Sequence, residues 1–287
     1  MSCPYSGKHD PSGPALKPYG RSDITYNTYL KIEELTSLQK LQSEPPHHDE
    51  MLFIVIHQAY ELWFKLILGE IKVAMDHMKK NEVLRAHHFV KRCVEVMKLL
   101  VQQIHILETM TPVEFLEFRD RLMPASGFQS SQFRELEFVA GLKDEKYLVF
   151  FDNEPKALAA LKERLAAPDL RDVYFDLLRA NGFKIPKNAA ETERSQNPGD
   201  REPTIRALLS IYQRPDDNLP LYLLTEKLVE LDEYLGLWRI HHINVVERVI
   251  GFKQGTGGSS GVSYLKSTTT KKAFPSLWEA RTYLEKV

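Results

Sequence analysis

The segment from residue 51 to residue 71, MLFIVIHQAYELWFKLILGEI, restricts the possible folds more than any other part of the chain. It is long enough to span a bilayer, but it contains His57, Glu61, Lys65 and Glu70. Charged side chains are costly inside a hydrocarbon layer. The segment therefore predicts a buried helix rather than a membrane span, and we expect no membrane association.

Apolar residues recur at helical spacing along most of the chain, and no segment of any length alternates as a β-strand does. Residues 1–22, rich in Pro, Gly and Ser, predict an irregular arm. Residues 184–203 predict a polar loop and residues 255–261 a glycine-rich loop. The sequence thus predicts one all-α domain, 23–287, built from long antiparallel helices. The expected helices are 23–43, 48–80, 83–109, 111–124, 130–140, 154–166, 169–181, 204–213 and 219–250.

Charge and cysteine content exclude several classes of protein. Lys and Arg number 38 and Asp and Glu 39, which gives a formal net charge of −1 and no attraction to nucleic acid. Cys3 and Cys93 are the only cysteines, which excludes a disulfide framework. The N-terminus has no apolar run typical of a signal peptide. We therefore expect a cytoplasmic protein without a nucleic-acid partner.

Two adjacent histidines, His241 and His242, lie near the end of the expected helix 219–250. Successive helix positions point about 100° apart, so only one of them can face inward. An apolar stripe shares its face with His242: Leu231, Leu235, Trp238, Val245, Val246 and Val249. A buried neutral imidazole needs a hydrogen-bond partner or a metal. His242 is therefore either a core residue bonded to a carbonyl or, since a haem needs only one protein ligand on one side, a haem ligand.

His57 and Arg119 are two further polar residues among apolar neighbours. His57 shares a helix face with Phe53, and it is either a core residue paired with Glu61 or a polar group in a pocket for a planar ligand. Arg119 shares a face with Phe115. Such an arginine either reaches water or an internal ion pair, or it binds a substrate carboxylate through two hydrogen bonds.

The glycine-rich stretch GTGGSSG, 255–261, is not a phosphate-binding loop, because no GK[ST] follows it. Its composition fits a plain linker. It also fits a loop whose backbone amides and Thr256 close over a ligand.

Taken together, four stretches of the sequence resemble the tryptophan 2,3-dioxygenase family. The resemblance implies a helical enzyme of tryptophan breakdown that contains haem b. Such an enzyme opens the indole C2–C3 bond of L-tryptophan with O₂ and gives N-formylkynurenine. The stretches are YNTYLKIEEL (26–35), HHDEMLFIVIHQAYELWFK (47–65), LLVQQIHILETMTPVEFLEFRDRLMPASGFQSSQFRELE (99–137) and LWRIHHINVVERVIGFKQGTGGSSGVSYL (237–265).

For the cofactor, the resemblance implies that His242 is the proximal ligand of the haem iron. Trp238, in the same WRxxH motif, lies beside the cofactor. Ser126 and Gly127 match a turn of the distal pocket that lies near both haem and substrate.

For the substrate, the resemblance implies that His57 contacts the indole N–H and is the candidate catalytic residue. Phe53 packs against the indole ring, Arg119 binds the carboxylate, and Thr256 holds the ammonium and carboxylate end. Many bacterial relatives have tyrosine where this chain has Phe115, and its hydroxyl helps to bind the carboxylate. Phenylalanine leaves more of that binding to Arg119.

The resemblance also implies an assembly. Members of the family are usually homotetramers, in which an N-terminal segment reaches into the site of a neighbouring subunit. Tyr26, Tyr29 and Leu30 match that segment.

Two other functions remain open from the sequence. A biosynthetic relative with the same pocket would oxygenate a substituted tryptophan or insert one oxygen atom to give an oxindole. A haem-binding sensor or carrier would need no amino-acid clamp, so Arg119 and the loop containing Thr256 argue against it.

Overall fold

The computed structural model describes residues 24–195, 197–253, 255 and 265–285. The chain divides into two compact units, 1–40 and 41–287. The described residues contain helices, turns and loops but no strand, which confirms the all-α prediction. A domain boundary after residue 22 remains a prediction, since it lies outside the described residues.

The described part of the first unit contains two short helices, α1 (Tyr26–Leu30) and α2 (Ile32–Thr36). The single helix expected over 23–43 is therefore wrong. Lys31, between the two helices, has φ 54° and ψ 46°, in the left-handed region that interrupts a right-handed helix. The side chain of Thr25 accepts a backbone hydrogen bond at the start of α1, as an N-cap does.

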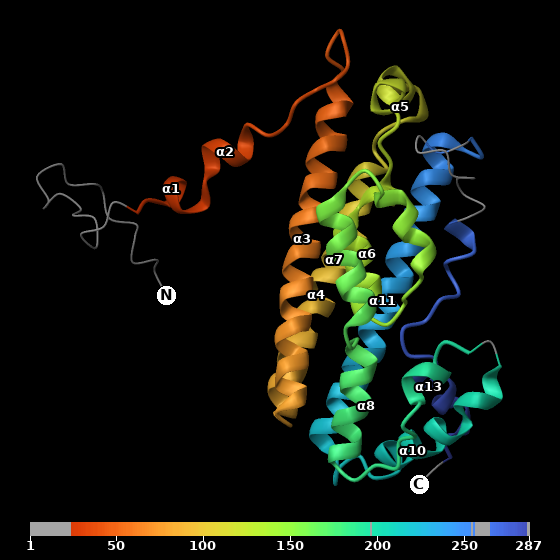
Figure 1. Ribbon diagram of the computed structural model, residues 1–287. Coiled ribbons are helices and arrows are strands. Elements are labelled where there is room, and N and C mark those ends of the chain that lie inside the picture. The colour runs from red at the N-terminus through yellow and green to blue at the C-terminus, as the bar shows by residue number, and fades with distance from the viewer. Residues whose placement is uncertain (1–23, 196, 254, 256–264, 286–287) are drawn as a thin grey trace, which may run out of the picture. The chain divides into compact units, whose positions relative to one another are not determined.

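Three long helices form the frame of the second unit (Figure 1). Side chains of α4 and α3 exchange hydrogen bonds with the facing backbone: Gln103 Nε2 donates to the Ile56 carbonyl (3.0 Å), and the Tyr60 hydroxyl to the Leu100 carbonyl (3.1 Å). Residue 103 of α4 thus lies opposite residue 56 of α3, and residue 100 opposite residue 60, so the two helices are antiparallel. The three helices are α3 (His48–Lys79), α4 (Val83–Leu107) and α11 (Leu219–Ile250).

The third long helix, α11, runs beside α4 in the same direction. Lys98 Nζ lies 2.8 Å from a carboxylate oxygen of Glu230, and Arg248 lies 4.0 Å from Glu108 further along both helices. Helices α3 and α11 each pack on α4. The antiparallel arrangement expected from the sequence therefore holds for α3 against both α4 and α11.

The remaining helices surround this frame and mostly begin and end where the sequence indicates. Thr111 and Glu114 form a capping box at the start of α5. Gly141 and Gly182, with φ of 102° and 87°, follow the ends of α6 and α8. The helices are α5 (Pro112–Arg119), α6 (Ser131–Val139), α7 (Pro155–Ala166), α8 (Leu170–Ala180), α9 (Ala189–Thr192), α10 (Glu202–Gln213) and α13 (Pro275–Ala280), with 3-10 turns η1 (Asp120–Leu122), η2 (Gly127–Gln129), η3 (Glu145–Phe151), η4 (Pro198–Arg201) and η5 (Arg281–Tyr283).

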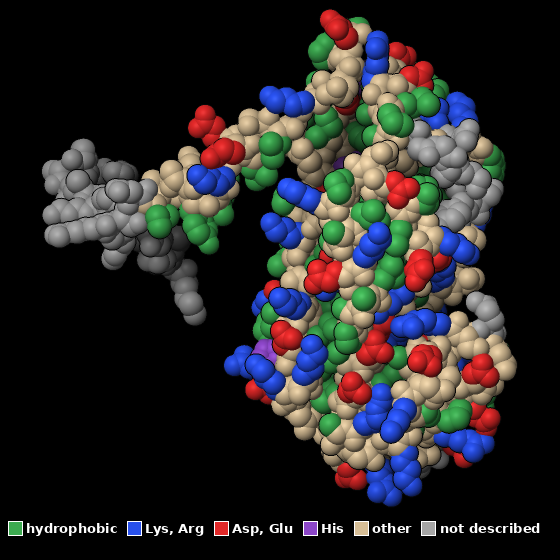
Figure 2. All heavy atoms as spheres, in the orientation of Figure 1, with side chains coloured by type: hydrophobic (Ala, Val, Ile, Leu, Met, Phe, Trp, Pro, Cys, Tyr) green, Lys and Arg blue, Asp and Glu red, His purple; other side chains and the backbone are tan. Residues whose placement is uncertain are grey.

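Helix α3 is long and apolar enough to cross a membrane by length and composition alone. In this structure one face of the helix packs against α4, α6 and α8. A single helix of this kind is also what the core of a helical protein contains, so it is weak evidence for a membrane span. Figure 2 shows Lys, Arg, Asp and Glu side chains interspersed over the visible face of the second unit, as on a solvated surface.

Residues 184–203 are more ordered than the expected polar loop, because they contain α9 and η4 and bury two charged side chains. Glu193 is 4% exposed and accepts a hydrogen bond from the Ser276 backbone N–H (3.1 Å). Arg201 is 6% exposed and donates to the carboxylate of Glu279 through Nε (3.0 Å). Two charged residues of this largely exposed polar segment are thus buried by contacts with the C-terminal part of the chain, one hydrogen bond and one ion pair.

The burial of Glu193 predicts a pH-dependent gain in stability for Glu193→Gln. Burial raises the pKa of the Glu193 carboxyl, against hydrogen bonds from Ser276 that lower it. A raised pKa in the folded state means that stability falls as the pH rises through that pKa. In denaturant titrations, the difference in free energy of unfolding between the glutamine variant and wild type should increase in favour of the variant as the pH rises from 5 to 8. Exposed Glu191→Gln is the control, and an equal gain there would contradict the assignment.

Candidate functional site

A cavity of about 250 Å³ lies between α3 and α11, with α4, α5 and α6 completing its walls. Most of its lining is aliphatic and aromatic, and a few polar side chains interrupt it. Such a lining suits a planar organic ligand, because apolar walls bind the rings and isolated polar groups fix the orientation.

Eight of the residues predicted from the sequence line this one cavity, although they come from four separate parts of the chain. Ser126, the N-cap of η2, accepts a hydrogen bond from the Phe128 N–H through its side chain. Thr256 lies outside the described residues, and Tyr26, Tyr29 and Leu30 lie in the first unit. The eight are Phe53, His57, Phe115, Arg119, Ser126, Gly127, Trp238 and His242.

His242 is the histidine that faces the cavity, as helical geometry predicts. Its ring stacks on Trp238, with centroids 5.2 Å apart and planes 5° from parallel. His241 is outside the cavity lining and contacts His105, with centroids 5.3 Å apart. Burial, with a smaller contribution from His57, lowers the pKa of His242 to about 4. The ring is therefore neutral near pH 7, which is the form that binds a metal.

His57 is held in one orientation by its own helix. Its Nδ1 lies 2.7 Å from the Phe53 carbonyl oxygen, which can only accept, so Nδ1 carries the proton and Nε2 is left as an acceptor. Burial lowers the pKa of His57, partly opposed by this hydrogen bond and by the charge of Glu61. Glu61 is not the hydrogen-bond partner, since its carboxylate accepts from Ser130 (2.6 Å) and Gln132 (2.8 Å).

Aromatic rings surround the end of the cavity at which Arg119 lies. Phe115 packs against Phe53 (5.8 Å between centroids) and edge-on against Phe118 (5.3 Å). Arg119, the last residue of α5, is half-buried and lines the cavity. This end therefore combines flat apolar surfaces with one guanidinium group.

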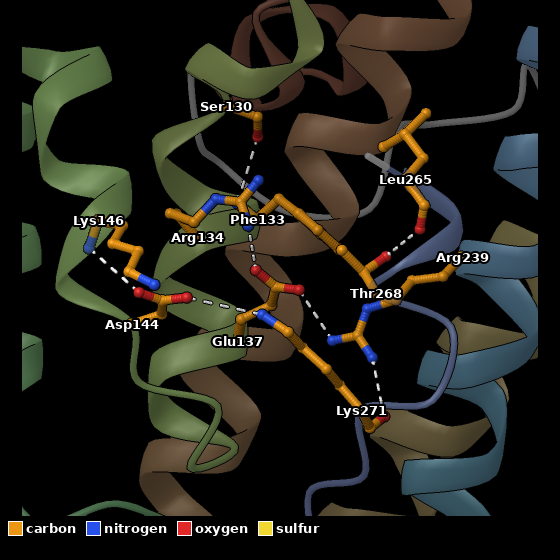
Figure 3. A network of polar contacts seen from close by, with 10 residues as sticks. All are labelled: Ser130, Phe133, Arg134, Glu137, Asp144, Lys146, Arg239, Leu265, Thr268 and Lys271. Atoms are coloured by element: carbon orange, nitrogen blue, oxygen red, sulfur yellow. Dashed lines mark hydrogen bonds and ion pairs between the residues drawn. The ribbon is translucent and has the colours of Figure 1, made fainter. Parts of the chain in front are cut away.

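A cluster of three charged side chains in the cavity wall was not predicted from the sequence (Figure 3). Arg239 Nη2 donates to one carboxylate oxygen of Glu137 (2.8 Å), and Arg134 Nη1 donates to the other. The guanidinium of Arg134 also lies over the ring of Tyr147, 3.7 Å from its centre. We call Arg134, Glu137 and Arg239 the wall network. All three are buried and line the cavity.

The wall network carries buried donors that lack a partner. The Nε–H groups of Arg134 and Arg239 are buried and unpaired, and the Trp238 indole N–H, near the Tyr60 hydroxyl, forms no hydrogen bond of good geometry. Two guanidinium groups and one carboxylate leave a net charge of +1. Unpaired buried donors are unfavourable. The arrangement therefore suits a ligand that brings an anionic acceptor into the cavity.

The spacing of three residues between Arg134 and Glu137 is typical of an exposed ion pair on a helix, so it does not single the pair out as part of a site. One sequence feature could have indicated this cluster: Arg239 is a charged residue within the apolar stretch LWRIHHI, three positions before His242.

Comparison with known proteins identifies the family. The family model described as Tryptophan 2,3-dioxygenase matches residues 14–190 and 187–284. A curated tryptophan 2,3-dioxygenase from Bacillus thuringiensis (strain Al Hakam) is 43% identical over 265 residues, covering 92% of this chain and 94% of the relative. Proteins of the same name from Caulobacter vibrioides (44% over 262 residues; 91% and 99% covered) and Nocardioides sp. (44% over 268 residues; 92% and 96% covered) are as similar. The chain belongs to the tryptophan 2,3-dioxygenase family.

Proposed function

We propose that this chain is a haem-dependent dioxygenase that opens the indole C2–C3 bond of L-tryptophan with O₂ and gives N-formylkynurenine. One observation carries the proposal: a single cavity in a chain of this family contains a neutral inward histidine from α11, a histidine with a vacant acceptor nitrogen from α3, and an arginine from α5. Haem, when bound, supplies the redox-active iron that activates O₂.

The residues of the cavity fit a haem. The neutral ring of His242 would bind the iron, and Trp238, stacked on it, would hold the ring orientation. A porphyrin carries two carboxylates, and the excess positive charge of Arg134 and Arg239 over Glu137 in the cavity lining suits them. The turn at 126–127 lines the same space. The sequence contains no CxxCH for covalent attachment, which favours haem b.

The chain's own residues would bind and orient the substrate. Arg119 would hold the carboxylate through two hydrogen bonds, and Phe53 and Phe115 would pack against the indole. The unprotonated Nε2 of His57 would accept the indole N–H, which makes His57 an orienting group more than an obligatory base. Thr256 would complete the amino-acid end of the site. The apolar lining would exclude water from the reacting ring.

An assembly and a location accompany the proposed activity. In the first unit Tyr26 and Tyr29 are 74% and 75% exposed and Leu30 is 41% exposed. Two exposed rings three residues apart on the short helix α1 are suited to contact another subunit. We propose a cytoplasmic homotetramer in which this segment enters a neighbouring site.

The proposed activity is tested by aerobic turnover of the ferrous, haem-reconstituted protein with L-tryptophan and ¹⁸O₂. A product that contains two labelled oxygen atoms supports dioxygenation. A product with one labelled atom would instead indicate an oxindole-forming enzyme. Haem binding without turnover would indicate a carrier.

The orientation of His57 predicts a modest loss of substrate affinity in His57→Ala. Removal of one hydrogen bond typically costs about 0.5–1.5 kcal/mol, so the Kd for L-tryptophan should rise roughly 2- to 12-fold. Equilibrium titration of the haem absorption spectrum measures the Kd. His57→Gln, which retains an acceptor, should recover part of the loss, and exposed His105→Ala is the control. Full affinity and full rate in the alanine variant would remove this role from His57.

A further inference from the structure

The described chain resumes after the glycine-rich stretch at Leu265, and in the segment 265–271 Lys271 contacts the wall network (Figure 3). Arg239 Nη1 donates to the Lys271 backbone carbonyl (3.3 Å). The Lys271 ammonium lies 3.7 Å from the Asp144 carboxylate and 5.5 Å from the centre of the Tyr147 ring. This segment is thus attached to the cavity wall through both its backbone and a side chain.

Arg239 is the group shared by the cavity and this segment. It is 4% exposed, and its two Nη atoms donate to different partners, Glu137 and the Lys271 carbonyl, while its Nε–H has no partner. Leu265 and Thr268 also line the cavity, and the Thr268 hydroxyl donates to the Leu265 carbonyl (2.7 Å). A change in the orientation of one guanidinium therefore alters the cavity wall and the support of the segment together.

Charge makes the orientation of Arg239 sensitive to the contents of the cavity. Glu137 is a single carboxylate shared between two buried guanidinium groups. An additional carboxylate on the cavity side would pair with the two guanidinium groups that line the cavity and neutralise their excess positive charge. The planar, forked guanidinium would then be fixed in the geometry that also reaches the Lys271 carbonyl.

We propose that the wall network couples cofactor binding to the order of residues 265–271, in that the carboxylates of a bound porphyrin fix Arg239 and Arg239 in turn fixes the segment that follows the glycine-rich loop. Glu137 and Arg239 are then positioning residues for a segment of which Leu265 and Thr268 line the cavity. This coupling rests on the proposed function in one respect, that the cavity binds haem.

Hydrogen–deuterium exchange of the full chain with and without haem tests the coupling, since amide exchange reports local opening. In wild type, haem should slow exchange of the amides in 265–271 roughly fivefold to tenfold, the effect expected from about one stabilised hydrogen bond. Peptides from α10, away from the cavity, should not change. Wild type that binds no haem contradicts the proposed function. Wild type that binds haem without this protection contradicts the coupling alone.

Arg239→Lys is the decisive variant, because lysine retains the positive charge but lacks the planar fork that joins Glu137 to the Lys271 carbonyl. It should bind haem, measured by absorbance, yet lose most of the haem-dependent protection of 265–271, and its KM for L-tryptophan should rise more than its kcat falls. Arg164→Lys, in the pair with Glu135 outside the cavity lining, is the matched control. Unchanged protection in Arg239→Lys overturns the proposal.

A second measurement needs no variant and so does not depend on whether Arg239→Lys folds. The dimethyl ester of haem keeps the iron and the ring but has no carboxylates. Wild type saturated with the ester should show no protection of 265–271. If the ester does not bind to the protein, the same absence of protection is expected. Protection equal to that given by haem would exclude the carboxylates as the coupling groups.

Discussion

Replacement of His242 by alanine is expected to weaken haem binding by about 100-fold or more, whereas replacement of His241 should leave it unchanged. Loss of a group that only orients a metal ligand costs about 10- to 100-fold in affinity, and loss of the ligand itself should cost at least the upper end of that range. The two residues are adjacent on α11, but only His242 lines the cavity.

Titration of the haem-free proteins with haem, followed by absorbance, measures this difference. Free imidazole should restore ligation in the His242→Ala protein, because the substitution leaves a cavity of the right size beside Trp238. Rescue by imidazole separates loss of the ligand from loss of the fold. Wild-type haem affinity and an unaltered spectrum in His242→Ala would show that another residue ligates the iron.

The inward direction of His242 was predictable because it depends only on the local geometry of one helix and on apolar neighbours three and four residues away. The bounds of α3 and α4 were predictable for a similar reason, since long periodic patterns outweigh local exceptions. The break at Lys31 was not predictable in this way, because a left-handed lysine has no distinctive sequence signal.

The wall network could not be derived from the sequence by such local reasoning. Arg134 and Glu137 look like an exposed pair on a short helix, and they are buried only because α6 packs where Arg239 of α11 reaches them. The same limit applies to Glu193 and Arg201. The polar composition of their segment predicts a loop, and the residues that bury them lie in α13, far away in the sequence. Buried charges are stabilised by partners distant in sequence, so their burial is a tertiary property.

Arg119→Ala is expected to lower kcat/KM for L-tryptophan about 30-fold or more. Loss of one partner of a desolvated, hydrogen-bonded charge pair typically costs about 2–5 kcal/mol, and 1.4 kcal/mol corresponds to a factor of ten. Phe115, on the same helix, has no hydroxyl to share the substrate carboxylate, so the effect should be large in this chain. Arg119→Lys should lose less, because it keeps the charge but not the fork. Adding Phe115→Tyr to it should restore part of the affinity through a new hydroxyl donor.

A substrate without the carboxylate separates binding from structural support. Tryptamine lacks the group that Arg119 is proposed to hold, so its turnover should be slow in wild type and little changed by Arg119→Ala. Exposed Arg121→Ala removes the same charge two residues further along and should leave steady-state turnover of both substrates as in wild type. If Arg119→Ala reduced the turnover of tryptophan and tryptamine by the same factor, Arg119 would support the end of α5 instead of the substrate. A loss confined to tryptophan would place the substrate carboxylate at Arg119.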